Sequence, residues 1–213
     1  MIKNIELIAQ SAIRIKSQDN KVIYFDPFKL GVNYNNDADL IYITHSHFDH
    51  FSPEDILKIK KEETKIIAPE DLRGEIEKIG FDERNVLLVK PNNDYNIENI
   101  EFSTIPAYNI NKDFHKKEFN WVGYIVNIDG ERVYVAGDTD NTEEARNVKC
   151  DIACIPIGGT YTMTYEEAAD LINTIRPMLA IPTHYKTIVG TVQDAQKFKE
   201  KIAENIEVKI LMK

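Results

Sequence analysis

The histidine-rich stretch His-Ser-His-Phe-Asp-His at residues 45–50 holds the side chains best suited to chemistry in this sequence. In an extended loop alternate residues point the same way, so His45, His47 and Asp49 can converge on one side while His50 faces a neighbouring point. Imidazole and carboxylate ligands together suit zinc, and also iron or manganese. The alternative is a solvated loop with unrelated histidines, and the spacing favours metal binding over it.

The flanking sequence places this cluster on a loop that leaves the carboxyl end of a strand. Residues 38–43 form a short apolar run that predicts a buried strand. Ser52 suits the N-cap of a helix and Pro53 its first position, and acidic residues follow, so a helix is predicted over 53–61. Open α/β sheets place their sites at the carboxyl ends of strands.

Two further ligand-type residues also follow apolar strands. Asp138 comes after the run 133–136 and Gly137, which permits a sharp turn, and its carboxylate could bridge two metal ions. An Asx-type turn is the alternative there. His184 follows the run 179–182, where a capped or core histidine is the alternative.

The two halves of the chain repeat a pattern of strands. Asp26 and Asp138 follow similar apolar runs 112 residues apart, and the runs 39–43 and 151–155 keep the same offset. This self-similarity predicts one domain over 1–213 with two similar halves, about 1–105 and 106–213. The fold class expected is α/β (α+β), a four-layer αββα sandwich of two mixed sheets. Chance similarity between buried strands is the alternative.

Periodicity and capping signals predict the remaining elements. Strands are expected over the ranges 2–8, 11–16, 21–25, 64–69, 86–89, 100–105 and 208–211. Helices are expected over 70–79, 164–175 and 191–204, the last two opened by Thr164 and Thr191. A polar turn is expected over 91–94.

Composition limits the classes of function. The net charge of −9 argues against a protein that binds the nucleic-acid backbone. No apolar run approaches the roughly 20 residues of a membrane span, and the first residues lead into no signal-peptide pattern. We therefore expect a cytoplasmic protein with no nucleic-acid or membrane partner.

The motif at 45–50 resembles the first metal motif of the metallo-β-lactamase superfamily of metal-dependent hydrolases. Gly-Asp-Thr at 137–139 is similar to the motif that supplies its bridging aspartate, and His184 to its last metal histidine. The resemblance implies one ion on the first two histidines of the motif, a second on its last two ligands and His184, and a bridging carboxylate between them. The implied ligands are His45, His47, Asp49, His50, Asp138 and His184.

Residues 155–163 and 181–185 narrow the resemblance to a largely uncharacterised subfamily of metal-dependent hydrolases. This subfamily is related to the ascorbate-6-phosphate lactonases and, more distantly, to phospholipase D-type enzymes that act on N-acyl phosphatidylethanolamines. Most of residues 20–188 match. Asp26 resembles the aspartate that lies beneath the metal loop and accepts an N–H from a metal-bound histidine; a turn-forming aspartate before proline is the alternative.

One departure from the family pattern concerns the first ion. Where the family has Pro-Ala-aromatic-His, this chain has Asn109 at the histidine position. Asn109 could bind weakly through its carbonyl oxygen, His115 could reach in from the loop 110–118, or only one ion is held firmly. His115 could instead contact an anionic substrate or be an ordinary surface residue.

The predicted function is hydrolysis of a small ester, lactone or phosphoester by a metal-activated water. The cofactors expected are one or two divalent ions, zinc first, with manganese, iron or nickel as alternatives. Asp49 or Asp138 would move the proton, the backbone of Gly158 and Gly159 would approach a bound anion, and Tyr161 and Tyr185 would line the pocket. The substrate is expected to be a small, anionic molecule, and a homo-oligomer is compatible with the sequence. Competing hypotheses are a degenerate protein that only binds a metal or metabolite, and redox chemistry at iron.

Overall fold

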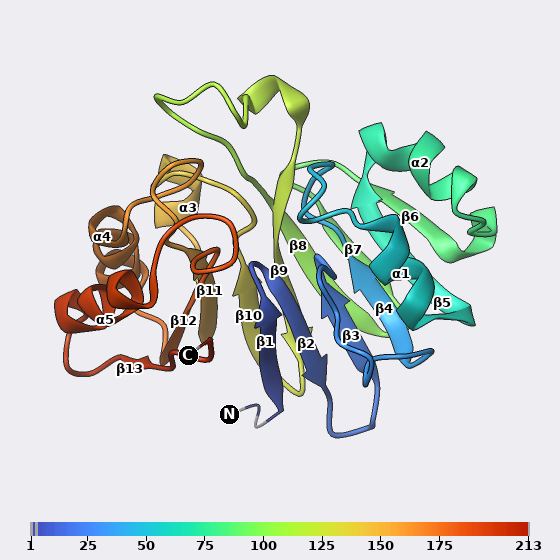
Figure 1. Ribbon diagram of the computed structural model, residues 1–213, viewed down its shortest axis with the longest axis horizontal. Coiled ribbons are helices and arrows are strands. Elements are labelled where there is room, and N and C mark those ends of the chain that lie inside the picture. The colour runs from blue at the N-terminus through green and yellow to red at the C-terminus, as the bar shows by residue number, and fades with distance from the viewer. Residues whose placement is uncertain (1, 3, 213) are drawn as a thin grey trace.

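The apolar runs of the first part of the chain pair into one mixed sheet (Figure 1). The structure, a computed structural model, describes residue 2 and residues 4–212. Its strands, in spatial order, are β1 (Ile5–Ala9), β2 (Ala12–Lys16), β3 (Val22–Phe25), β4 (Ala38–Tyr42), β5 (Lys60–Pro69) and β6 (Val86–Val89). β1, β2 and β3 are antiparallel neighbours, whereas β3 through β6 run parallel.

The second sheet repeats this plan. Its strands, in spatial order, are β13 (Glu207–Val208), β12 (Leu179–Thr183), β11 (Ile152–Pro156), β10 (Glu131–Val135), β9 (Val122–Ile128), β8 (Ile100–Pro106) and β7 (Asp94–Ile97). β7 through β10 are antiparallel, and β10 through β13 are parallel. The repeated runs therefore occupy equivalent places, β3-β4-β5 in one sheet and β10-β11-β12 in the other. β7 and β8 already pair in the second sheet, so the change of sheet falls between β6 and β7.

Helices cover the outer face of each sheet, as predicted for an αββα sandwich (Figure 1). On one side lie α1 (Pro53–Ile59) and α2 (Arg73–Lys78), and on the other α3 (Glu143–Arg146), α4 (Tyr165–Ile175) and α5 (Val192–Lys201). The capping signals work as expected, since the Ser52 side chain accepts from the Asp55 N–H, and Thr164 and Thr191 each form a capping box.

The two sheets pack face to face through large buried side chains. The Tyr42 ring of β4 lies 5.1 Å from the Tyr124 ring of β9 and 5.2 Å from the Phe102 ring of β8. Its neighbour Ile41 points to the opposite face of the sheet and packs in the cluster that includes Ile56 of α1. This alternation puts an apolar layer on both faces of β4, so the strand is buried on both sides and the loop 43–50 leaves from its end.

Some element boundaries differ from the predictions. The helix expected over 70–79 begins as a 3₁₀ turn, η1 (Glu70–Leu72), before α2, and the helix expected to reach 204 ends at Lys201. β13 covers 207–208 of the expected strand 208–211. β1 begins at Ile5, and residue 3 of the strand expected over 2–8 lies outside the described residues.

Two strands had no counterpart in the sequence-based predictions. β7 begins at Asp94, the last residue of the predicted turn. β9 contains Gly123, a residue that weakens strand signals. In the sheet the glycine is required, because a Cβ at this position would lie 2.6 Å from the Ala136 carbonyl oxygen. Close approach of two backbones, invisible in the sequence, selects the glycine.

Candidate metal centre

All five histidines of the chain meet at the carboxyl ends of the parallel strands. Three lie on the loop after β4, one follows β12, and His115 comes from the segment between β8 and β9, which also contains the 3₁₀ turn η3 (Lys117–Phe119). Together with two aspartates they form overlapping groups whose ligand atoms all lie within 4.8 Å of one another. These groups are His45–His47–His115, His45–His50–Asp138 and Asp49–His50–His184.

The first group consists of three imidazoles. The Nε2 atom of His45 lies 3.1 Å from Nδ1 of His47. The His115 ring lies 5.1 Å from the His45 ring and 4.9 Å from the His47 ring, measured between centroids. Trp121 covers one side, with its ring 4.9 Å from both His45 and His47. His115 therefore supplies the third imidazole that position 109 lacks.

Asn109 explains how His115 is held there. Its side-chain oxygen accepts from the His115 backbone N–H at 3.1 Å and lies 3.0 Å from the ring Nδ1. Its amide nitrogen donates to Asp140 at 3.2 Å and to the Tyr161 carbonyl at 3.0 Å. Both ends of the amide are thus engaged, and with Nδ1 of His115 directed at Asn109, Nε2 points to the centre. Of the three alternatives for position 109, this geometry favours His115 reaching in.

The group Asp49–His50–His184, taken together with Asp138, is called the second group below, and it combines imidazoles with carboxylates. His184 Nε2 lies 3.0 Å from Asp138 Oδ2 and 3.6 Å from Asp49 Oδ2. His50 Nε2 lies 3.2 Å from Asp138 Oδ1 and 3.6 Å from Asp49 Oδ2. Since Asp138 Oδ2 is also 3.3 Å from His115 Nε2, this carboxylate stands between the two groups.

Asp26 anchors the second group from below. Its Oδ2 lies 2.7 Å from His50 Nδ1, and the carboxylate also accepts from the Thr44 backbone N–H at 2.8 Å and from the Thr44 hydroxyl at 2.7 Å. Asp26 is fully buried. Because the Nδ1 proton of His50 is directed at this carboxylate, Nε2 is free to face the centre, which is the arrangement expected beside a metal ligand.

Gln10 is a contributor that the sequence-based predictions missed. Its amide nitrogen donates to Asp49 Oδ2 at 2.9 Å, and its backbone carbonyl accepts from the His184 N–H at 2.8 Å. It is fully buried in the turn between β1 and β2. The sequence offered one signal for this residue, a polar pair at 10–11 between two apolar runs, which is typical of a tight turn between strands.

The remaining predicted site residues take varied places. A Cβ on Gly158 would lie 2.5 Å from the His184 carbonyl oxygen and 2.9 Å from its Nδ1, so this glycine makes room for His184. The Gly159 N–H donates to the Met163 carbonyl at 2.9 Å. Tyr161 lines the pocket over the centre. Tyr185 is fully buried, and its hydroxyl donates to the Met212 carbonyl at 2.9 Å.

The charges of the second group are mutually stabilised. Burial opposes a charge on Asp138, but His184 and His50 hold the pKa of this carboxyl well below its usual value. Burial likewise opposes protonation of His184, yet Asp138 and Asp49 raise its pKa to about 9. In the first group, by contrast, burial and the neighbouring His50 lower the pKa of His45. Positive charge is therefore favoured between the carboxylates of the second group.

Buried atoms without hydrogen-bond partners show that the donor set fits metal ions. Nε2 of His50, His115 and His184 and Oδ1 of Asp138 are all buried and unpartnered among the described residues. Such atoms are rare in proteins because they forfeit their contacts with water. Here they converge within one small volume, and imidazole nitrogen with carboxylate oxygen is a donor set for zinc, iron or manganese. The residues present therefore fit one or two divalent cations.

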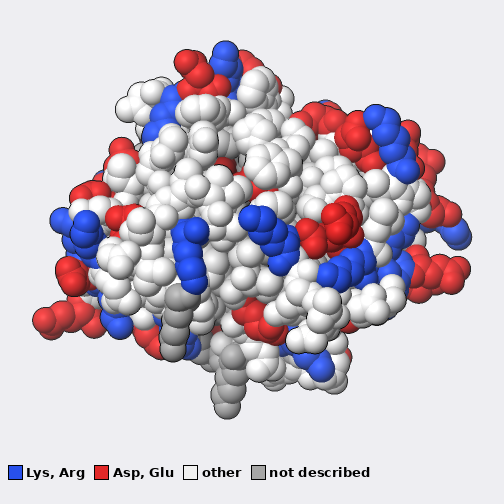
Figure 2. Space-filling model, viewed as in Figure 1, with Lys and Arg blue, Asp and Glu red and all other residues white. Residues whose placement is uncertain are grey.

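A pocket of about 310 Å³ opens over the centre. Its floor is formed by ligand-type residues and its walls by Phe48, Phe114, Tyr161 and Ile188. The space-filling view shows one face of the molecule, and its upper middle is mostly white, whereas Lys and Arg side chains lie across its centre and at its edges (Figure 2).

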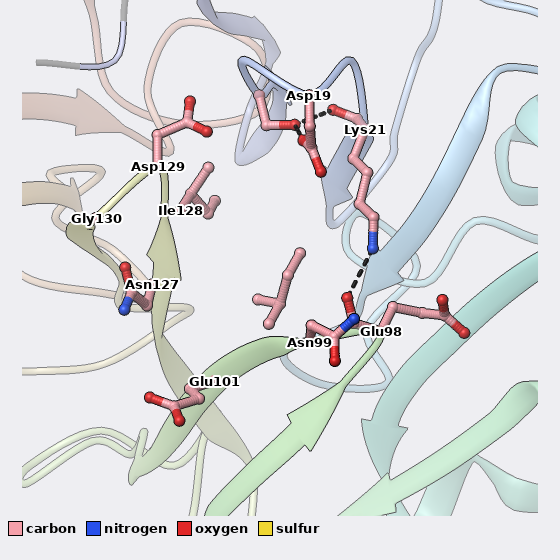
Figure 3. Close-up of a pocket in the computed structure, with 11 residues that line it drawn as sticks. Asp19, Lys21, Glu98, Asn99, Glu101, Asn127, Ile128, Asp129 and Gly130 are labelled. Atoms are coloured by element: carbon pink, nitrogen blue, oxygen red, sulfur yellow. Dashed lines mark hydrogen bonds between the residues drawn. The ribbon is translucent and has the colours of Figure 1, made fainter.

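A second hollow, of about 420 Å³, lies among the turns that precede β3, β8 and β10 (Figure 3). Its lining carries several carboxylates but neither histidine nor cysteine. These groups are engaged locally: Asp19 accepts from the Ser17 hydroxyl, Asp129 accepts from the Gln18 N–H, and Lys21 donates to the Glu98 carbonyl at 2.7 Å. This hollow therefore lacks the convergent, unpartnered donors that mark the metal centre.

Comparisons with known proteins agree with this geometry. A model of the β-lactamase superfamily domain matches residues 4–184. A UPF0173 metal-dependent hydrolase of Thermococcus kodakarensis is 31% identical, over 99% of this chain and 96% of its own length. The crystal structure of a candidate metal-dependent hydrolase from Parabacteroides distasonis superposes with a TM-score of 0.82 and 30% identity, covering 97% of this chain and 91% of that one. A metallo hydrolase from Ignicoccus hospitalis, at 24% identity and a TM-score of 0.79, shares the fold over 97% of this chain and 93% of its own. In the described part of the chain, no helix has the length and apolar character needed to cross a membrane.

Proposed function

Given that the chain belongs to the β-lactamase superfamily and is a metal-dependent hydrolase, we propose that it cleaves a small ester, lactone or phosphoester at the centre between the two sheets. The observation that carries this proposal is the convergence of the unpartnered Nε2 atoms of His50, His115 and His184 on the carboxylate of Asp138. A buried set of donors in this arrangement suits a two-metal hydrolytic site.

The ligands divide into two sets in this proposal. The first cation would be held by His45, His47 and His115, and the second by Asp49, His50 and His184. Asp138 contributes to both. Zinc is the proposed metal because it accepts this mixture of nitrogen and oxygen donors, and manganese, iron and nickel are the competitors.

When bound, the cations lower the pKa of a water towards about 7 and polarise the scissile oxygen. The protein keeps the imidazoles oriented through Asp26, Asn109 and Thr44, and the Gln10 amide holds one oxygen of Asp49. These contacts place the ligands before substrate arrives, so little reorganisation accompanies the reaction.

Asp49 is better placed than Asp138 to move the proton. Burial acts to raise the pKa of Asp49, but the nearby imidazoles of His184 and His50 lower it, so the group is anionic at neutral pH. Both Asp49 and Asp138 line the pocket. Asp138 lies within 3.3 Å of three imidazole nitrogens, and both of its oxygens are engaged in these ion pairs. We therefore assign proton transfer from the water to the leaving group to Asp49.

The alternative of a protein that only binds a metal or metabolite was suggested by the missing imidazole at position 109. Because His115 brings a third imidazole to the first group, this reason for expecting lost chemistry disappears. The hydrolase proposal is therefore favoured over the binding protein.

Elemental analysis and an activity panel test the proposal together. Protein purified without added metal should contain close to two ions per chain, and chelation should abolish turnover of chromogenic ester, lactone or phosphodiester probes until zinc or manganese is returned. Asp138→Asn should lose both metal and turnover, whereas the matched Asp129→Asn, in the second hollow, should lose neither. Full metal content and turnover in Asp138→Asn would refute the proposed centre.

A further inference from the structure

Exposed apolar side chains gather at the mouth of the metal centre. Phe48, Phe114 and Ile188 are 68%, 45% and 39% exposed, and all three line the pocket over the centre. They come from three separate loops, after β4, before η3 and after β12. Large apolar groups left in water at one place, above a site of this kind, mark a surface that a ligand covers.

These side chains are held in place as walls. The Phe114 ring packs edge-on against Tyr161, with centroids 4.7 Å apart, and the Phe48 ring packs edge-on against Phe28 at 5.9 Å. Each ring therefore has a fixed neighbour on one side and an open side towards the pocket. The pocket of about 310 Å³ is near the lower end of the range of roughly 300–1,000 Å³ for small-molecule sites.

No lysine or arginine is present among the described residues that line this pocket. Two basic side chains of the neighbouring loop are paired elsewhere, since Lys112 contacts Asp140 at 2.6 Å and Lys117 contacts Glu144 at 2.7 Å. The charged protein groups that remain are the carboxylates and imidazoles of the floor. A phosphate or carboxylate remote from the reacting bond would therefore lose its hydration without gaining a basic partner.

We infer that the substrate carries an uncharged apolar group, an aryl or short branched alkyl group, that lies between Phe48, Phe114 and Ile188 while its scissile bond faces Asp49 and Asp138. This inference rests on the proposed function and narrows its substrate class. It departs from the anionic substrate expected from the sequence. Specificity then comes from the loops at the rim, and reactivity from the strand ends at the floor.

Hydroxamates provide a test that does not depend on knowing the scissile bond, because they bind divalent metals and only their binding is measured. Three probes are titrated calorimetrically into the zinc-loaded protein: acetohydroxamate, phenylacetohydroxamate and 4-carboxyphenylacetohydroxamate. The phenyl probe should bind roughly tenfold more tightly than the methyl probe, since its ring is removed from water. The added carboxylate should cancel this gain.

Truncation of the walls locates the effect. Phe114→Ala and Ile188→Ala should each reduce the preference for the phenyl probe to about threefold or less, with the affinity for acetohydroxamate unchanged. Leu57→Ala, at a leucine that is 49% exposed on α1 away from this pocket, is the matched control and should keep the full preference. Because the readout is a ratio of affinities within one variant, partial loss of folded protein does not alter it.

Each other outcome contradicts a defined part of the proposal. Equal affinity for the methyl and phenyl probes, or tighter binding of the carboxylated probe, would overturn the inference and leave the hydrolase proposal standing. A preference that survives in Phe114→Ala and Ile188→Ala would likewise overturn it. Failure of zinc to load, with no hydroxamate bound at all, would remove the proposed function and this inference with it.

Discussion

The first and second groups of the metal centre, called its first and second halves from here on, are built in different ways. His50 and His184 leave the ends of parallel strands and are held by fully buried groups, Asp26 beneath one and Gln10 beside the other. In the first half, His115 comes from an irregular segment and is oriented through the side chain of Asn109. One half is thus part of the sheet framework, and the other is completed by a loop.

The two halves of the metal centre also differ in their charge. The second half contains the carboxylates of Asp49 and Asp138, which attract a cation, whereas the first half is mainly three imidazoles, of which His45 and His47 have lowered pKa values because of their burial. A preorganised, anionic site pays less to bind a divalent ion than a neutral site closed by a loop. We therefore expect the second half to hold its metal more tightly.

The largest effect should follow from breaking the second half. His184→Asn removes the imidazole but keeps a residue that tolerates the backbone φ of 56° at this position. Metal content should fall by at least one ion per chain and turnover by roughly a thousandfold, because the bridging carboxylate loses a partner as well. Unchanged metal content by elemental analysis would show that His184 is not a ligand.

A smaller effect is expected when the first half is broken. His115→Ala should lose about one ion per chain, keep the second, and reduce turnover roughly a hundredfold. Trp121 lies beside His45, His47 and His115, so quenching of its fluorescence by added Co²⁺ should weaken in the variant. Lys116→Ala is the control on the same loop. Undiminished quenching in His115→Ala would remove His115 from the ligand set.

Variants of the orienting residues should affect one half of the centre at a time. Asp26→Asn and Asn109→Leu each leave the ligands in place but remove their orienting partner, which should weaken metal affinity about 10- to 100-fold. The loss should fall on the second half in Asp26→Asn and on the first half in Asn109→Leu. Competition titration with a chelating dye, combined with Trp121 quenching, separates the two, and identical losses at both halves in either variant would contradict the division.

The smallest expected effect is a dependence on pH that is confined to the second half. Because the pKa of His184 is raised from 6.5 to about 9, a metal must displace its proton, and affinity should rise with pH through this range. The stability of the metal-free protein depends on pH in the opposite direction. Because the pKa of His184 is raised in the folded state, its protonation stabilises the fold below pH 6.5, and this contribution is lost as the pH approaches 9. Calorimetry in buffers of different ionisation enthalpy would detect the released proton, and metal affinity independent of pH would contradict the assignment.

The αββα sandwich could be predicted from local signals. Apolar runs such as 38–43 and 179–182 form buried strands wherever they are covered on both faces, and the polar residue that follows each run must leave the sheet at the same edge. For this reason the sequence alone predicts that Asp138 and His184 lie near the loop 45–50. β9 escaped prediction because its glycine is explained only by the Ala136 backbone that packs against it.

What the sequence alone determined was therefore the set of strand-end residues, since strand formation and strand direction depend on neighbours in the chain. The residue that completes the first half of the centre is set by the fold, because His115 is placed by Asn109 through hydrogen bonds within an irregular loop. The same holds for Gln10, which meets Asp49 across 39 residues, and for the apolar walls, which three unrelated loops bring together. Side-chain contacts between distant segments have no periodicity, and so they leave no pattern in the sequence.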